Sequence, residues 1–282
     1  MQVLSRTPIA IALLALAAGA QAADWSDTSI GFRTGNKFAE PFEGNNIHKN
    51  IFDLNHASGY AYGSNFFNVD FLMSDKNDPA GAGSTNGAQE TYIVYRHTLD
   101  LDKVLKMPMK FGPVRNFGIT AGFDVNAKTD AGYNSKKRMA VLGPTVMVDV
   151  PGFLNISLLE LWESNAPYNT FSGVSTPRYS YKVHPMLTAA WGIPFGPGFS
   201  FEGFANFIAS KGTNEFGGPT AAETNIDAQV MYDLGALAGA KGKFKLGIEY
   251  QYWKNKFGNP ASGPAGSGAF AKTTMVRAEY HF

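Results

Sequence analysis

The sequence predicts an all-β protein, a transmembrane antiparallel up-and-down β-barrel of twelve strands. Three observations support this fold class. Apolar and polar residues alternate with a period of two along most of the chain, as they do on strands with one apolar and one polar face. The alternating segments run for about 10 to 14 residues, longer than the five or six that are usual in soluble sheets. Short and long connections also alternate, as periplasmic turns and extracellular loops do in outer-membrane barrels.

The composition agrees with this class and excludes several others. Charged residues make up 17% of the 282 residues, below the roughly 25% of an ordinary soluble domain, and aromatic residues make up 13%. The formal net charge is only +1, so we expect no nucleic-acid partner. The chain holds no cysteine, which excludes a disulfide framework and a thiolate metal site. We expect no metal and no cofactor.

Residues 1–22 have the parts of a secretory signal peptide. Arg6 supplies the positive charge, residues 9–18 form a short apolar run, and an Ala-Gln-Ala cleavage site ends at Ala22. The apolar run is too short to span a bilayer as a helix. We therefore expect cleavage after Ala22 and one barrel domain over residues 23–282. Export without cysteines fits the outer membrane of a Gram-negative bacterium.

The predicted strands follow one another along the whole of this domain. They lie at roughly 25–34, 45–57, 62–74, 88–99, 114–126, 138–150, 153–165, 177–191, 198–210, 222–234, 242–255 and 270–282. Short connections rich in Gly and Pro are expected at 58–61, 151–152, 192–197 and 235–241. Longer ones are expected at 35–44, 75–87, 127–137, 166–176, 211–221 and 256–269. The connection 100–113 is an exception, because it is long but falls on the side of the short turns.

The strands differ in how clearly their two faces separate. In strand 114–126, Ile119 and Phe123 belong to the apolar face, and Asp124 belongs to the polar face. Strand 177–191 alternates in the same way. Strand 153–165 does not, because Glu160 and Trp162 oppose Leu159 and Leu161, and no face is assigned to it.

The C-terminal strands alternate most regularly. In strand 242–255 the apolar face includes Leu246 and Ile248, and the polar face includes Glu249. Strands 198–210 and 222–234 repeat the pattern. The last strand, 270–282, ends on the aromatic Phe282, with Tyr280 on the same face. This ending resembles the C-terminal signature that the outer-membrane assembly machinery reads, so we expect that machinery to be a partner.

Several stretches are similar to the Tsx-like nucleoside-specific channel-forming family of outer-membrane proteins. They are Ile47-His48-Lys49-Asn50, Phe66-Phe67-Asn68-Val69-Asp70, Tyr95-Arg96-His97-Thr98-Leu99-Asp100-Leu101-Asp102-Lys103 and Phe111-Gly112-Pro113-Val114-Arg115-Asn116-Phe117. The family also has a long turn where this chain has 100–113. The resemblance implies a monomeric twelve-stranded barrel with a narrow channel that takes up nucleosides. It also implies that the protein could serve as a receptor for phage or colicins.

The polar faces predict which side chains line the lumen. Basic candidates are Arg33, Lys49, Arg96, Arg178, Lys182, Lys243, Lys245 and Arg277. Acidic candidates are Asp27, Asp53, Asp70, Glu90, Asp124, Glu202, Glu223, Asp227, Glu249 and Glu279. Because both signs recur, we expect little discrimination between small cations and anions.

Aromatic side chains on the polar faces are candidates for stacking against a base or sugar ring. They are Phe66, Tyr92 and Trp253. The proposed substrate-binding set is therefore Phe66, Asp70, Glu90, Tyr92, Arg96, Asp124, Glu249 and Trp253. These residues predict passive uptake of small polar solutes, with nucleosides as the preferred class.

Two other functions stay open. The charged side chains could pair across strands and merely fill a plugged structural or receptor barrel. Alternatively, His56 and Ser58 could belong to a membrane-embedded lipid hydrolase or acyltransferase. No third catalytic residue is identifiable, and such catalysis needs all three groups in contact. We therefore expect no catalytic residues, and the expected partners are outer-membrane lipid and small solutes.

Overall fold

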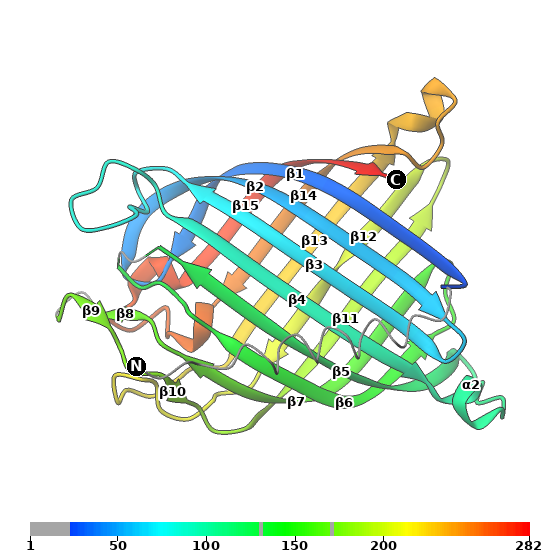
Figure 1. The fold of residues 1–282 in the computed structure, drawn as a ribbon, viewed down its shortest axis with the longest axis horizontal. Coiled ribbons are helices and arrows are strands. Elements are labelled where there is room, and N and C mark those ends of the chain that lie inside the picture. The colour runs from blue at the N-terminus through cyan, green and yellow to red at the C-terminus, as the bar shows by residue number, and fades with distance from the viewer. Residues whose placement is uncertain (1–22, 130–131, 170–171) are drawn as a thin grey trace, which may run out of the picture.

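The chain closes into a β-barrel in this computed structural model, which describes residues 23–129, 132–169 and 172–282. Within these ranges twelve long strands form the wall (Figure 1). They are β1 (Trp25–Glu40), β2 (Glu43–Tyr60), β3 (Gly63–Ser74), β4 (Gln89–Asp100), β5 (Val114–Lys128), β6 (Arg138–Val148), β7 (Phe153–Asn165), β11 (His184–Phe195), β12 (Phe199–Ile208), β13 (Glu223–Asp233), β14 (Phe244–Lys254) and β15 (Phe270–His281). The expected signal peptide, residues 1–22, lies outside the described residues.

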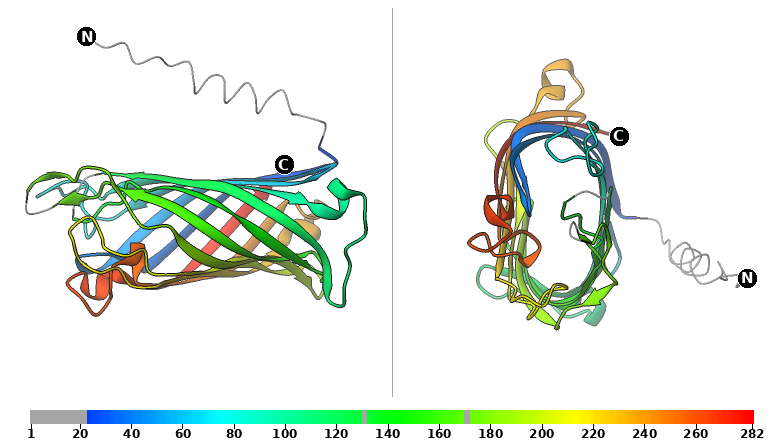
Figure 2. Two further views of the ribbon diagram at one scale, coloured as in Figure 1. Left: turned by 90° about the horizontal axis from the view of Figure 1, so that it is seen from below. Right: turned by 90° about the vertical axis from the view of Figure 1, so that its left-hand side faces the viewer.

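Every pair of neighbouring wall strands is antiparallel, and the first strand pairs with the last. In this closure Ser29 of β1 lies opposite His281 of β15, and Gly35 lies opposite Met275. The consecutive strands β6 and β7 also pair, so the sheet closes on itself. Seen along its axis, the barrel has an oval cross-section (Figure 2). The predicted fold class is therefore confirmed.

The two ends of the barrel differ in the length of their connections. One end has the turns 61–62, 149–152 and 196–198, together with α2 (Leu101–Leu105) and the 3-10 helix η1 (Leu234–Ala238). The other end has the longer connections 75–88, 129–137, 166–183, 209–222 and 255–269, with the small strands β8 (Tyr168–Asn169), β9 (Val174–Ser175) and β10 (Tyr179–Ser180) and the 3-10 helices η2 (Lys256–Gly258) and η3 (Gly266–Ala269). We refer to these as the periplasmic and extracellular ends, following the usual arrangement of such barrels.

The prediction of a long loop over residues 35–44 is wrong. Strand β1 continues to Glu40 and β2 begins at Glu43, so only a tight turn separates them. The register shifts between Gly35 and Phe38, and Phe38 then pairs with Ile47. This irregularity breaks the period of two, which hides the strand in the sequence. The extension is stabilised because Phe38, Ile47 and nearby apolar residues pack together inside the barrel.

The predicted strand 177–191 begins too early. In the structure β11 begins at His184, and the preceding segment is part of a loop in which β10 pairs with the end of β7. The rings of Tyr179 and Tyr181 make an edge-to-face contact there, with centroids 5.4 Å apart. The alternation of apolar and polar residues over 177–183 therefore belongs to a loop that packs on the end of β7, and not to a strand of the wall.

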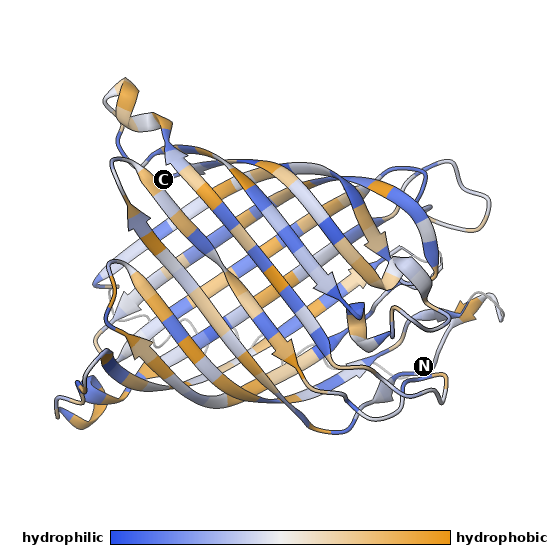
Figure 3. Cartoon of the chain, turned by 180° about the vertical axis from the view of Figure 1, so that it is seen from behind, coloured by the Kyte–Doolittle hydropathy of each residue, from blue (hydrophilic) through white to orange (hydrophobic). Residues whose placement is uncertain are grey.

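The outer surface of the barrel is apolar. Ile248, Leu158 and Val276 are each about half exposed, and hydrophobic residues alternate with hydrophilic ones along the strands (Figure 3). Phe32 and Phe52 face outward side by side, with ring centroids 5.0 Å apart. Among the described residues, no helix is long and apolar enough to cross a membrane.

Strand β7, whose face the sequence leaves open, has an apolar inner face. Leu159 and Leu161 are almost fully buried and belong to an inward cluster with Met139, Val141, Met186 and Ile208. Glu160 and Trp162 point outward. Because part of the inner wall is apolar here, the usual rule of polar inside and apolar outside cannot orient this strand.

A pair of substitutions in β14 tests the facing of the wall. We expect Ile248→Arg to place a charge in lipid and to lower the free energy of unfolding by roughly 2–4 kcal/mol. Gln251→Arg should fold normally, because Gln251 points inward and its amide bonds Asp227. Urea unfolding in lipid vesicles measures both variants. Equal losses from the two would show that the face assignment is wrong.

Candidate functional site: the lumen of the barrel

All eight residues of the predicted binding set point into the barrel. Asp70 lies opposite Tyr92, and Phe66 lies opposite Arg96, so these four share one face of β3 and β4. Glu90 and Asp124 follow on the same face of β4 and β5, and Glu249 and Trp253 share a face of β14. Arg33 of β1 confirms which face is inside, because it bonds Asp70 on β3 and Glu249 on β14, strands that are not its neighbours. Period-two alternation located this set.

An ion-pair network crosses the middle of the lumen. Arg33 donates to Glu249 at 2.8 Å and pairs with Asp70 at 2.5 Å. Arg277 of β15 donates to the second oxygen of Glu249 at 2.9 Å. The side chain of Glu249 is 0% exposed and holds both guanidinium groups. The network therefore joins strands on both sides of the β1–β15 closure.

The centre of the lumen has more acidic than basic groups. Besides Glu249, Arg277 contacts Glu279 at 2.6 Å and Asp53 at 3.4 Å. Asp227 lies beside Glu249 and accepts a hydrogen bond from Gln251. Two guanidinium groups thus face five carboxyl groups, those of Asp53, Asp70, Asp227, Glu249 and Glu279.

Three predicted basic lumen residues lie elsewhere, which corrects the expected balance of charge. Arg178 is exposed and donates to the main-chain carbonyl of Lys136 in the extracellular loops. Lys182 lies in the loop before β11, and Lys243 lies in the periplasmic turn before β14. These residues continue the alternation of β11 and β14 in the sequence, but they lie before the first residue of those strands.

A second group of polar side chains lies on β3, β4 and β5. Arg96 pairs with Asp124 at 2.5 Å, and the Tyr92 hydroxyl donates to the other oxygen of Asp124 at 3.2 Å. Phe66, directly opposite Arg96, is 39% exposed although it points inward. The side chains of Arg96 and Asp70 are also about one-fifth exposed. Water therefore reaches this part of the lumen, which contains an unstacked aromatic ring.

The extracellular mouth is closed by buried ion pairs between loops and wall. Glu40 at the end of β1 accepts hydrogen bonds from Lys49 of β2 at 2.5 Å and from Lys256 of loop 255–269 at 2.9 Å. Asp78 of loop 75–88 pairs with Lys128 of β5 at 2.9 Å and with Lys49 at 3.6 Å. All five side chains are at most 6% exposed. We call these five residues the mouth cluster.

A second buried cluster closes the other side of the mouth. Lys211 of loop 209–222 donates to Glu163 at the end of β7, at 2.6 Å. Tyr133 of loop 129–137 is buried, and its ring lies 5.9 Å from that of Phe257. Burial raises the pKa of the Tyr133 phenol well above its ordinary value, so the group stays neutral. The loops therefore fill the mouth with their own side chains.

Two of the predicted aromatic residues already have partners in this closed state. Trp253 donates to Glu223 at 2.5 Å, its ring lies 5.1 Å from that of Phe257, and the Lys256 ammonium lies 4.5 Å from its ring centroid. Tyr92 is tied to Asp124 as described above. Phe66 is therefore the predicted aromatic residue whose ring is open to water in this structure.

The features that would support a hydrolase are not assembled. His56 bonds the hydroxyl of Thr28 at 2.7 Å, and Ser58 lies opposite Ser26 on the same outward face. Within the described ranges, no group of three or more His, Cys, Asp or Glu is placed to hold a metal ion.

Several solved structures are similar to this chain in fold, among them a porin and the translocator domain of an autotransporter. The KdgM porin is 12% identical, with 90% of this chain and 99% of that chain covered and a TM-score of 0.44. The translocator domain of the autotransporter NalP from Neisseria meningitidis is 12% identical, with 97% and 95% covered and a TM-score of 0.45. OccAB1 of Acinetobacter baumannii is 10% identical, with 92% and 96% covered and a TM-score of 0.39. No family model and no curated protein matches the sequence.

The architecture itself defines the class of the protein. A closed antiparallel barrel with an apolar outer wall, a polar lumen, short turns at one end and long loops at the other is that of a transmembrane β-barrel of the Gram-negative outer membrane. The resemblance to the Tsx-like family stays a prediction.

Proposed function

We propose that this protein is a narrow outer-membrane channel for small polar solutes that are neutral or cationic, with nucleosides as the preferred class. The observation that supports this most is the water-accessible stretch formed by Phe66, Asp70 and Arg96, which runs from the central ion-pair network toward the periplasmic end of the lumen. A solute entering here meets an aromatic face, a carboxylate and a guanidinium within one strand pair. The acidic excess at the centre disfavours anions.

A nucleoside matches this stretch chemically. Its base can stack on an aromatic ring such as Phe66, which contributes roughly 1–3 kcal/mol per base. Arg96 can donate to base or ribose oxygens, and Asp70 can accept from hydroxyl or amino groups. The sequence resemblance to nucleoside channels supports the same substrate class. The buried ion pairs above this stretch require that the mouth open during transport.

The closed mouth also supports a second candidate function, a plugged barrel that acts as a surface receptor. The mouth cluster buries three lysines and two carboxylates between loops and wall. These groups pair with one another, so a bound solute is not needed to balance their charges. Such a barrel would display its extracellular loops and conduct no ions. Conductance therefore separates the two functions.

Single-channel recording in planar bilayers tests the proposal. We expect discrete conductance with cations favoured over anions in a KCl gradient, because the centre of the lumen is acidic. Nucleosides should block this current at concentrations where simple sugars have no effect. A protein without conductance would favour the receptor function, and equal block by sugars and nucleosides would contradict the nucleoside preference.

The stacking role of Phe66 makes a separate prediction. Phe66→Ala should weaken nucleoside block by roughly 1–3 kcal/mol, because it removes the open aromatic face. Phe71→Ala is the matched control, since Phe71 lies on the same strand but faces lipid. Titration of the block with adenosine and uridine measures both variants. A similar weakening in the control would show that the lost ring acts through folding.

A further inference from the structure

The long periplasmic connection 101–113 has an unusual surface. It begins with α2 and projects beyond the end of the barrel (Figure 1). Several apolar side chains on it are exposed: Leu105 is 56%, Met107 is 54% and Phe111 is 78% exposed. Exposed apolar groups gathered on one turn mark a surface that is covered by a partner or a membrane.

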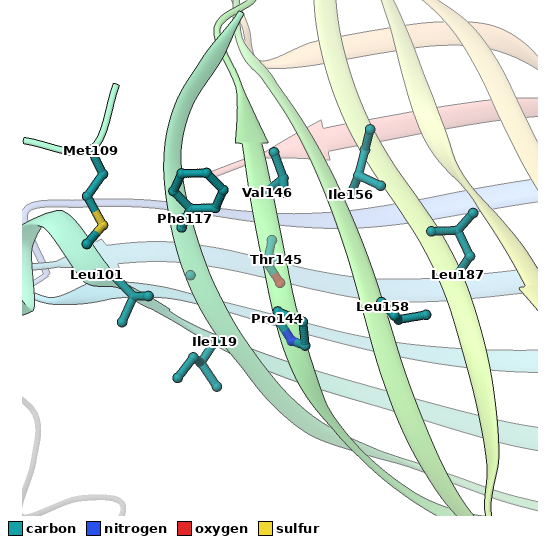
Figure 4. Close-up of a pocket in the computed structure, with 11 residues that line it drawn as sticks. Leu101, Met109, Phe117, Ile119, Pro144, Thr145, Val146, Ile156, Leu158 and Leu187 are labelled. Atoms are coloured by element: carbon teal, nitrogen blue, oxygen red, sulfur yellow. The ribbon is translucent and has the colours of Figure 1, made fainter. Parts of the chain in front are cut away.

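This turn overhangs an apolar groove on the outer wall. Met109 and Leu101 form its edge, and its floor consists of outward side chains of β5, β6, β7 and β11, among them Phe117, Val146 and Leu158 (Figure 4). Because the floor residues face outward, the groove is continuous with the apolar surface that contacts lipid. Its occupant in the membrane is therefore hydrocarbon.

The same turn carries three lysines near Met109 in the sequence, of which Lys103 lies 3.9 Å from Asp100. Lys103, Lys106 and Lys110 lie within it, and Asp102 is the acidic residue of the same segment. Lys106 is exposed at the end of α2. Lys110 is exposed and pairs with Asp149 of the next periplasmic turn at 2.5 Å. Lysines beside an apolar groove complement a lipid with a negative head group.

We propose that this turn and the groove bind an anionic phospholipid of the periplasmic leaflet. An acyl chain lies in the groove between Met109 and the outer wall, and the phosphate lies against Lys106 and Lys110. A phospholipid fits better than a periplasmic protein, because the groove runs along the lipid-facing wall where a soluble partner cannot reach. The proposal depends on the orientation of the barrel and not on the proposed channel function.

Native mass spectrometry of the whole protein tests the charge requirement, with phosphatidylglycerol and phosphatidylcholine as probes. We expect wild type to retain phosphatidylglycerol, and the double variant Lys106→Gln/Lys110→Gln to bind it about tenfold more weakly. Asp149→Asn should bind it more tightly, because it frees Lys110. The control Lys241→Gln/Lys243→Gln removes two lysines from a different periplasmic turn and should bind as wild type does. Equal loss in the control would overturn the proposal.

Fluorescence quenching tests the groove independently. Met109→Trp should be quenched more strongly by phosphatidylglycerol brominated on its acyl chains than by brominated phosphatidylcholine. Leu237→Trp, exposed on the other large periplasmic turn, should not distinguish the two lipids. Equal quenching of Met109→Trp by both lipids, or protection of it by a periplasmic protein without lipid, would overturn the proposal.

Discussion

Glu249→Leu should lower the free energy of unfolding by about 3–5 kcal/mol, the range found when one partner of a buried ion pair is removed. Glu249 is fully buried and accepts hydrogen bonds from both Arg33 and Arg277. Without its carboxylate, the two buried guanidinium groups repel each other and keep only their other partners, Asp70 for Arg33 and Asp53 and Glu279 for Arg277. Urea unfolding of the barrel in vesicles measures the change.

Glu202→Gln is the matched control for this experiment. Glu202 also points into the lumen and pairs with a basic residue, Lys245, at 3.2 Å. That pair is partly exposed, however, so its removal should cost less than about 1 kcal/mol. A loss of similar size in the two variants would show that the buried ion pairs of Glu249 contribute no more to the stability of the barrel than the partly exposed pair of Glu202.

Glu40→Gln should open the extracellular mouth and raise the channel conductance. Glu40 neutralises Lys49 and Lys256 and lies 3.6 Å from Lys128. Removing its charge leaves three buried ammonium groups beside Asp78, so their repulsion should release loop 255–269 from the wall. Single-channel conductance should rise, and a protease added outside intact cells should cut this loop faster.

Glu43→Gln is the control for the mouth. Glu43 begins β2 on the same hairpin, and its side chain accepts hydrogen bonds from Asn45 at an exposed position. This substitution should leave conductance and cleavage unchanged. If Glu40→Gln also leaves both unchanged, the mouth cluster is a permanent plug, and the receptor function gains support.

The sequence predicts the lumen well where strands are regular and poorly where loops enter it. Glu249 and Trp253 could be placed because β14 alternates without a bulge. Asp78 and Lys256 could not, because they come from loops and their partners lie far away in the chain. Their burial depends on how the loops fold back over the mouth. The alternation of apolar and polar residues along the chain does not show this.

The wrong boundaries have equally local causes. The register shift after Gly35 interrupts the alternation, so a continuous hairpin resembles a polar loop in the sequence. The inner face of β7 is apolar because Leu159 and Leu161 pack against Met186, and the two faces of that strand then look alike. In both places apolar residues pack inside the barrel, so the sequence departs from the regular alternation of apolar outward and polar inward residues.

The pairing of β1 with β15 has a consequence for the order of folding. Ser29 and His281 are separated by nearly the whole barrel sequence, so we expect this contact to form late. Before it forms, β1 and β15 are unpaired edges, and Arg33 and Glu249 belong to opposite borders of an open sheet. Joining the two edges therefore also brings Arg33 to Glu249 and Arg277 to Asp53. An open sheet lacks both the β1–β15 pairing and the ion pair of Arg33 with Glu249, so we expect the two to form together when the barrel closes.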